Sequence, residues 1–267
     1  MGGERRTESG VAPALWLRRI DSMSFVPSGL VFRRVRSRWG AESPLMILDE
    51  KTRYLQIAFN YDVALVRRIL PTVVHSERIL IEAGTPFIKR EGSAGIRAIR
   101  SMWDGHLVAD LKTVDGALGE VQEVHAAGAN AATVLGGSPA EALDLFIAHC
   151  AALGMNSMID MLGVKDPLKV LMQLRTPPNV VVLHLGRDEE STRGKMIQYR
   201  HVSRVRSKFN VLISAAGGVD LGEARSAIFN GANIVVANLV HPDDPWTGIS
   251  TDTDVAEMAQ EFLTTIE

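Results

Sequence analysis

The stretch His106–Gly136, HLVADLKTVDGALGEVQEVHAAGANAATVLG, holds one complete strand–helix–strand unit and decides the fold class. It opens with the apolar run HLVADLK, continues with a segment of helical periodicity and closes with a second apolar run, NAATVLG. Gly128 stands between the helical segment and the second run, where a glycine commonly ends a helix. Its phrase Gly-Ala-Asn recurs at Gly231, again directly before an apolar run. The recurrence is a weak sign of a repeated helix–strand unit.

Eight such apolar runs follow one another along the chain. Most are short, rich in Val, Ile and Leu and flanked by turn residues, as expected for parallel strands covered on both faces. Helical patterns separate them; in the segment 138–154, Ser138 is expected to cap a helix that begins at Pro139. The runs are YLQIAFN (54–60), RILIEAG (78–84), HLVADLK (106–112), NAATVLG (130–136), NSMIDM (156–161), NVVVLH (179–184), NVLISAA (210–216) and ANIVVAN (232–238).

Eight strand–helix units in about 210 residues predict an α/β fold, a (β/α)8 TIM barrel over residues 46–267. An open doubly wound sheet would normally carry a glycine-rich turn after its first strand. The chain has Asn60-Tyr61-Asp62 at that place, without a glycine. The barrel is therefore the expected architecture.

Composition excludes several classes of protein. The chain has 267 residues, 46% of them hydrophobic, and a net charge of −2, which argues against a dedicated nucleic-acid binder. No apolar run approaches the roughly 20 residues that span a bilayer. Cys150 is the only cysteine, so no disulfide can form within the chain and a reducing cytoplasm is expected. Its apolar helical surroundings favour a packed thiol over a nucleophile.

Residues 1–45 differ from the rest of the chain, because they hold eight arginines and four acidic residues. The segment lacks a continuous apolar core followed by a cleavage site, which argues against a secretory signal. Three alternatives stay open: an organellar transit peptide, a disordered arm, or an upstream start with Met46 as the true first residue. In each case the segment is expected to add little to the barrel core.

Polar residues stand at the ends of six of the eight predicted strands. In a barrel all carboxyl ends meet on one face, where barrel enzymes hold their active sites. A single polar residue there is commonly only solvated, but this concentration favours a functional site. The residues are Asn60, Glu82, Asp110, Lys112, Asp160, His184 and Ser214.

The segment VADLKTVD, residues 108–115, gives the sharpest functional signal. Asp110 and Lys112 are two apart on a strand and therefore point the same way. Each keeps the other charged, and the lysine can then serve as a fixed cation beside a developing anion. Asp115 follows on the loop. The alternative is a local ion pair at a strand end.

Three further features complete the candidate site. Glu82 and Asp110 come from neighbouring strands, and two carboxylates plus waters suit Mg²⁺. His184 ends an apolar run and can act as an acid or base, or serve a structural role. Arg187 can bind an anionic substrate or sit in solvent. Gly217 and Gly218 follow the seventh strand, where barrels commonly hold phosphate on backbone N–H groups.

Six phrases of the chain occur together in a known family: IEAGTPFIKREG (81–92), VADLKTVD (108–115), TVLG (133–136), MIDMLGVKDP (158–167), VLH (182–184) and ISAAGGVD (213–220). Together they resemble the 3-hexulose-6-phosphate synthase branch of the orotidine 5'-phosphate decarboxylase superfamily. The resemblance runs from about Leu55 to the C-terminal helix in consistent order. The Asp-x-Lys-x-x-Asp element is specific to the superfamily, and Glu-Ala-Gly-Thr-Pro points to the synthase and its sister, 3-keto-L-gulonate-6-phosphate decarboxylase.

The resemblance implies a homodimeric lyase that works through a 1,2-enediolate. Glu82 and Asp110 would hold Mg²⁺, Lys112 would stabilise the enediolate or donate a proton, and His184 would transfer protons. Asp115 would reach into the partner subunit's site. The enediolate of ribulose 5-phosphate attacks formaldehyde in a synthase, and the reverse reaction releases it. The expected substrate-binding residues are Asn60, Asp160, Arg187, Ser214, Gly217 and Gly218.

Two other functions stay open. His184 followed by Arg187 resembles the pattern of the sister decarboxylase, in which loss of CO₂ makes the same kind of enediolate. A barrel retained as a binding or regulatory protein belongs to a different class, and it would have no need to keep the acidic residues, Lys112 and His184 together.

Two positions depart from the family pattern. Asn60 stands where the family has an aspartate that binds substrate hydroxyls, and an amide carries no charge. Asn238-Leu239 stand where the family has a Gly-Arg pair that grips the phosphate. Losing a guanidinium removes a bidentate phosphate contact. These departures predict intact enediolate machinery with a changed or weakened grip on a phosphosugar.

Overall fold

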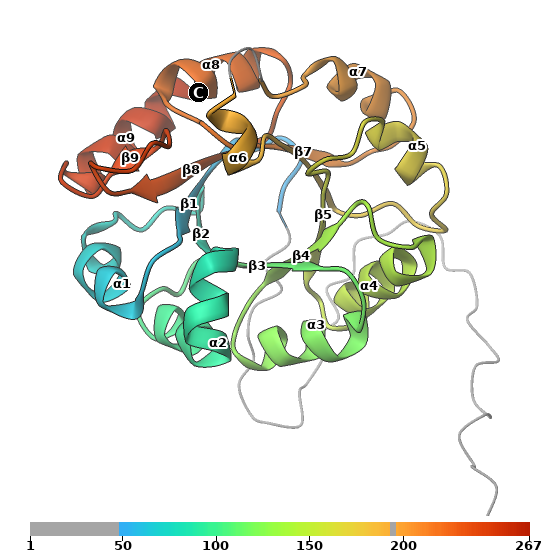
Figure 1. Cartoon of the computed structure of the whole chain (residues 1–267), viewed down its shortest axis with the longest axis horizontal. Helices are drawn as coiled ribbons and strands as arrows, with labels where there is room; N and C mark the ends of the chain where they lie inside the picture. Colours follow the sequence, from blue (N-terminus) through green and yellow to red (C-terminus); the bar gives the residue numbers. More distant parts are fainter. Residues whose placement is uncertain (1–47, 193–195) are drawn as a thin grey trace, which may run out of the picture. The chain divides into compact units, whose positions relative to one another are not determined.

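The protein forms a closed parallel barrel surrounded by helices. The computed structural model describes residues 48–192 and 196–267, which belong to one compact unit. Strands β1 to β8 pair in sequence order, and β1 also pairs with β8, which closes the barrel. Figure 1 shows the helices as an outer ring around these strands. The predicted (β/α)8 barrel is confirmed, and the predicted extension over residues 1–45 lies outside the described residues.

All eight predicted strands are present, within two residues of their expected bounds. They are β1 (Tyr54–Phe59), β2 (Ile79–Ala83), β3 (Leu107–Thr113), β4 (Ala131–Leu135), β5 (Asn156–Asp160), β6 (Val180–His184), β7 (Leu212–Ala216) and β8 (Ile234–Val240). A short strand that the sequence did not predict, β9 (Ile249–Ser250), pairs with the end of β8.

Helices connect successive strands, and the chain ends in a last helix, α9. They are α1 (Val63–Ile69), the 3-10 turn η1 (Leu70–Thr72), α2 (Thr85–Arg100), α3 (Ala117–Ala126), α4 (Ala140–Ala152), α5 (Pro167–Leu171), α6 (Arg187–Glu190), α7 (Arg200–Arg206), α8 (Leu221–Phe229) and α9 (Val255–Thr265). In the view of Figure 1, α6 lies nearer the barrel axis than the other helices do.

Two apolar layers hold these elements together, because successive side chains of a strand point to opposite faces. Leu55, Ile57 and Phe59 of β1 belong to the large cluster between barrel and helices. Tyr54 and Ala58 of the same strand belong to the second cluster, which fills the barrel interior. The last inward-facing residues of the strands therefore lie at the barrel mouth, where they form the candidate site.

Helix ends follow the sequence expectations with one correction. Gly128 and Gly231 have φ values of 101° and 94° and come directly after the C-caps of α3 and α8, as predicted. The predicted start of α4 is wrong by one residue, because Pro139 is the N-cap. Ser138 instead donates a long hydrogen bond of 3.4 Å from its hydroxyl to the carbonyl of Thr113.

Cys150 lies on α4 and is fully buried in the outer apolar layer. Burial raises the pKa of its thiol to about 12, which leaves almost no thiolate near neutral pH. The prediction of a packed thiol is confirmed. Within the described ranges, no helix is long and apolar enough to span a bilayer.

Candidate active site

Lys112 lies between two carboxylates at the carboxyl ends of β3 and β5. Its Nζ is 2.9 and 2.8 Å from the two oxygens of Asp110, and 2.7 Å from Oδ2 of Asp160. Burial by itself lowers the pKa of Lys112, but Asp110 and Asp160 outweigh burial and raise it above its usual range. The ammonium group is therefore a permanent cation, as predicted from VADLKTVD.

The backbone at Lys112 explains how its side chain reaches both acids. Lys112 has φ 49°, the single positive value at a non-glycine residue in the described ranges. The pairing of β3 with β4 shifts register between Ala109 and Thr113. An irregularity of this kind bends a strand and redirects a side chain. The strand therefore does not follow the regular two-residue alternation that the sequence predicted. A local bulge brings the side chains of Asp110 and Lys112 together instead.

Two hydroxyl groups that the sequence reasoning missed fix the carboxylate of Asp110. Thr85, the first residue of α2, donates to Oδ2 at 2.7 Å, and Thr133 of β4 donates to Oδ1 at 2.8 Å. With the two contacts from Lys112, Asp110 accepts four hydrogen bonds, which fills its capacity. Thr133 could have been found from its alternation with Ala131 on the inward face of its strand.

His184 extends this network at the end of β6. Its Nδ1 is 2.8 Å from Oδ2 of Asp160, and the other Asp160 oxygen accepts from the amide of Leu162 at 2.9 Å. Burial lowers the pKa of His184, but the neighbouring Asp160 outweighs it and the net shift is upward. Asp160 itself is held well below its usual pKa range: burial raises it, and His184 and Lys112 outweigh burial. Asp110, Lys112, Asp160 and His184 thus form one connected chain.

Glu82 lies inside the barrel on β2 and accepts a short hydrogen bond from Gln56 of β1. Burial, followed by the charge of Asp110, raises the pKa of Glu82 to about 7. The other amide atom of Gln56, Oε1, is buried and has no hydrogen-bond partner among the described residues. Burial and Asp110 thus outweigh Lys112, Gln56 and His184, which favour the charged form of Glu82.

Glu82 and Asp110 suit a divalent cation in their donor chemistry. They supply two carboxylates from neighbouring strands, and Mg²⁺ commonly needs no more from a protein than one or two. The raised pKa of Glu82 is the sign of an uncompensated carboxylate, which a cation would correct. A cation there would compete with Lys112 for the oxygens of Asp110. Within the described part of the chain, no three His, Cys, Asp or Glu side chains are arranged as a metal site.

The two departures from the family pattern lie at the ends of β1 and β8. The side-chain amide of Asn60 donates to Oδ1 of Asn238 at 3.0 Å, so these residues bind each other. Leu239 is fully buried in the layer between barrel and helices and pairs with Ile249 of β9. Neither position offers a cation to a phosphate.

The remaining predicted residues have different surroundings. Ser214 lies two residues before the end of β7 and is fully buried, deeper than the strand end where the sequence placed it. Gly217 and Gly218 form the turn from β7 to α8. Arg187 stacks over the ring of Trp246, with its Cζ 4.6 Å from the ring centre. Asp115 is exposed on the loop after β3.

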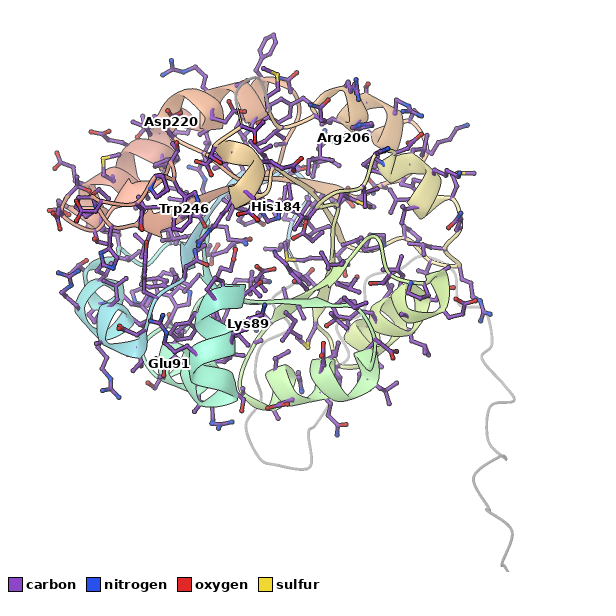
Figure 2. All side chains as sticks on the ribbon, in the orientation of Figure 1. Lys89, Glu91, His184, Arg206, Asp220 and Trp246 are labelled. Carbon is purple, nitrogen blue, oxygen red and sulfur yellow. The ribbon has the colours of Figure 1, made fainter. Side chains whose placement is uncertain are left out.

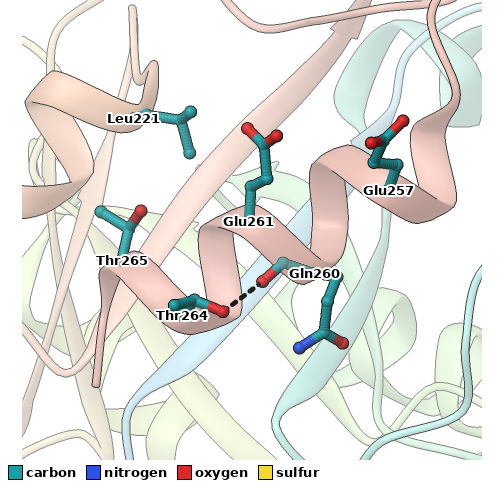
Figure 3. A pocket seen from close by; sticks show the side chains of 6 residues that line it. All are labelled: Leu221, Glu257, Gln260, Glu261, Thr264 and Thr265. Carbon is teal, nitrogen blue, oxygen red and sulfur yellow. Dashed lines mark hydrogen bonds between the residues drawn. The ribbon is translucent and has the colours of Figure 1, made fainter.

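A hollow on the outer surface is a weaker candidate site than the strand-end network. Figure 3 shows that hollow, which has a volume of about 350 Å³ and lies beside α9. Its lining contains no strand-end residue. In Figure 2, His184 and Trp246 lie inward of the outer helices, whereas Arg206 and Asp220 lie farther out. The lining residues of the outer hollow are Leu221, Glu257, Gln260, Glu261, Thr264 and Thr265.

Comparison with known families agrees with the barrel fold. The sequence profile of the Orotidine 5'-phosphate decarboxylase / HUMPS family matches residues 54–237. The chain belongs to this family. The match begins at β1 and ends within β8, so it covers every predicted site residue.

Curated relatives within the family carry the name bifunctional enzyme Fae/Hps. The protein from Methanothrix thermoacetophila is 34% identical over 216 residues, covering 80% of this chain and 53% of its own length. The protein from Methanocaldococcus jannaschii is 39% identical over 169 residues, covering 62% of this chain and 42% of its own length. The chain thus spans about half the length of the curated relatives it matches.

Solved structures share the same barrel. A 3-hexulose-6-phosphate synthase superposes with a TM-score of 0.68 at 26% identity, covering 80% of this chain and all of the other. The synthase from Salmonella typhimurium gives a TM-score of 0.69 at 24% identity, covering 80% of this chain and 98% of the other. The latter identity supports the fold alone.

Proposed function

We propose that this chain is a Mg²⁺-dependent carbon–carbon lyase of the hexulose-6-phosphate synthase type. It would join formaldehyde to ribulose 5-phosphate through an enediolate, and catalyse the reverse release. The observation that carries the proposal is the Asp110–Lys112–Asp160–His184 chain of contacts at the barrel mouth. The names of the Fae/Hps relatives and of the synthase structure support it.

In this proposal each side chain of the network has a chemical task. The C1 proton of ribulose 5-phosphate leaves to a base of the site, and its electron pair enters the enediolate. Lys112 stays charged and stabilises that anion as a fixed cation. The enediolate carbon then bonds to the carbon of formaldehyde, whose oxygen takes up a proton. His184, oriented through Nδ1 by Asp160, transfers protons with its remaining ring nitrogen.

Glu82 and Asp110 would hold the cation in this proposal. A bound Mg²⁺ would supply Lewis-acid stabilisation of the enediolate oxygens. The chain's own contribution is a rigid carboxylate at Asp110, fixed by Thr85 and Thr133, and a carboxylate at Glu82 whose pKa is raised by burial.

Replacing Glu82 with glutamine should stabilise the fold at pH 8 and remove the response to Mg²⁺. The pKa of Glu82 is raised from 4.5 to about 7, so the folded chain holds a proton in this range that the unfolded chain has lost. Wild-type stability should therefore fall as pH rises from 4.5 to 7 and stay lower above that. E82Q should melt at least about 3 °C higher at pH 8, and about equal to wild type below pH 4.5.

Thermal melts at pH 4 and pH 8, with Mg²⁺ or with EDTA, measure both effects. Mg²⁺ should raise the melting temperature of wild type at pH 8 and leave E82Q unchanged, because a ligand stabilises only a fold that binds it. Equal stabilisation of both proteins by Mg²⁺ would place the cation elsewhere.

We also propose a homodimer whose sites are shared, with Asp115 reaching its partner. Its exposed position after β3 leaves it available for such a contact. D115N and K112M should each be inactive alone. Mixed and reassociated, they should recover about a quarter of wild-type activity, because half of the dimers are mixed and each has one intact site. Recovery of no activity, with mixed dimers demonstrated, would place Asp115 in its own subunit's site.

A substrate screen that follows formaldehyde and CO₂ tests the proposed reaction against its alternatives. Consumption of formaldehyde with ribulose 5-phosphate supports the synthase. Release of CO₂ from a β-keto acid phosphate indicates the sister decarboxylase. Ligand binding without either product in the presence of Mg²⁺ would contradict both reactions and indicate a binding barrel.

A further inference from the structure

The turn between β7 and α8 has a backbone that glycine alone can supply. Gly217 and Gly218 have φ values of 95° and 64°, in the left-handed region. A Cβ atom at Gly217 would lie 1.9 Å from the carbonyl oxygen of Leu185, far inside contact distance. The turn therefore packs tightly under the loop that follows β6.

Three successive backbone amides of this turn donate no hydrogen bond to any residue that the structure describes. Within residues 48–192 and 196–267, the N–H groups of Gly217, Gly218 and Val219 donate no hydrogen bond. Gly217 and Val219 are buried. Buried N–H groups in folded proteins are nearly always paired, so an unpaired run at a strand's carboxyl end is suited to an anion.

The carboxylate of Glu190, the last residue of α6, lies directly against this turn. A Cβ atom at Gly218 would be 3.2 Å from both Cδ and Oε1 of Glu190. Oε1 accepts a hydrogen bond of 2.6 Å from the amide of Thr247, on the loop between β8 and β9. Oε2 is buried and has no partner among the described residues. The carboxylate is thus held between the loops that follow β6 and β8.

No cation compensates Glu190 within the described residues. Arg187 on the same short helix stacks on Trp246, and Leu239 at the end of β8 is buried in the apolar layer. The turn therefore meets the carboxylate of Glu190 at the place where a barrel of this kind would receive a substrate phosphate. Like charges brought together in a partly buried site repel strongly.

We propose that Glu190 is a specificity-determining residue whose carboxylate occupies the phosphate position beside the Gly217-Gly218 turn. A substrate phosphate must displace this carboxylate to bind. The inference rests on the proposed function, because it treats the barrel mouth as a phosphosugar site. We therefore expect normal binding of the sugar part of the substrate and weakened binding of its phosphate.

The test compares two variants of α6, each of which removes one negative charge. E190Q keeps the shape and the acceptor for Thr247 but loses the charge. D188N removes a charge from an exposed side chain of the same helix and serves as the matched control. Calorimetric titrations with inorganic phosphate, ribulose 5-phosphate and ribulose measure binding without any need for turnover.

E190Q should bind inorganic phosphate and ribulose 5-phosphate at least about tenfold more tightly than wild type, a shift of one decade in Kd. Its affinity for ribulose should be unchanged, and D188N should match wild type with all three ligands. Should E190Q fail to fold, E190A removes the same charge and takes its place.

Equal phosphate affinity in E190Q, D188N and wild type would overturn the proposal. An equal gain in affinity for ribulose would overturn the proposal as well, because the substitution would then affect binding of every ligand and not of phosphate in particular. Tighter phosphate binding by E190Q in a protein that consumes no formaldehyde would support the role of Glu190 and refute the synthase activity, so the two failures are separable.

Discussion

Replacing Lys112 with methionine should lower turnover of ribulose 5-phosphate and formaldehyde by at least about a thousandfold. The loss of a fixed donor to a developing oxyanion commonly costs about a hundredfold to a thousandfold. Lys112 also separates Asp110 and Asp160, whose carboxylates its Nζ contacts within 2.9 Å. Without it these two negative charges face each other, so the loss should lie at the upper end of that range.

The same variant should be less stable, because breaking a buried ion pair from one side costs about 3–5 kcal/mol. Circular dichroism therefore has to show that K112M is folded at the assay temperature. K89M is the matched control, since Lys89 is exposed on α2 (Figure 2) and should leave both quantities unchanged. A folded K112M that retains a tenth of wild-type turnover would remove Lys112 from the chemistry.

Replacing Asp160 with asparagine should lower turnover by about a hundredfold to ten-thousandfold, the range associated with general acid–base catalysis. Asp160 orients His184 through a contact of 2.8 Å and raises its pKa. Its removal should move the titration of His184 to lower pH, so the pH–rate profile of D160N should shift in the acid direction.

The pH–rate profile separates this positioning role from a structural one. A general loss of structure would lower activity at every pH and leave the profile in place. D252N removes an exposed carboxylate and should match wild type. An unshifted profile in folded D160N would mean that Asp160 does not act through His184.

The barrel could be predicted because its strands obey a simple rule. Doubly covered parallel strands are short apolar runs, and eight of them are visible between residues 54 and 238. β9 has two residues, Ile249 and Ser250, and no local pattern marks it. The bulge at Lys112 was equally invisible, because a positive φ at a lysine arises from tertiary packing rather than local preference.

The contacts of the candidate site could be predicted where charged residues stand at strand ends. Asp110, Lys112, Asp160 and His184 are in contact as expected. Thr85 went unnoticed because a hydroxyl at the start of a helix resembles an ordinary capping residue. Ser214 was placed at a strand end, but β7 continues to Ala216 and buries it.

The position of the Glu190 carboxylate could not be predicted from the sequence, for a different reason. It is the last of four successive charged residues, Arg187 to Glu190, and such a run is usually a solvated surface. Only the fold brings its carboxylate to Gly218 and to the amide of Thr247. From the sequence, Leu239 marks only the loss of a phosphate-binding arginine. The structure shows that it also fills the apolar layer between barrel and helices.

If the barrel mouth converts ribulose 5-phosphate into an enediolate, the C1 proton of the substrate should exchange with solvent. The substrate is incubated in D₂O with Mg²⁺ and without formaldehyde, and the C1 signals are followed by proton NMR. Wild type should exchange deuterium into C1, while K112M and wild type with EDTA should not. Exchange by folded wild-type protein no faster than by K112M would show that the barrel mouth does not form the enediolate.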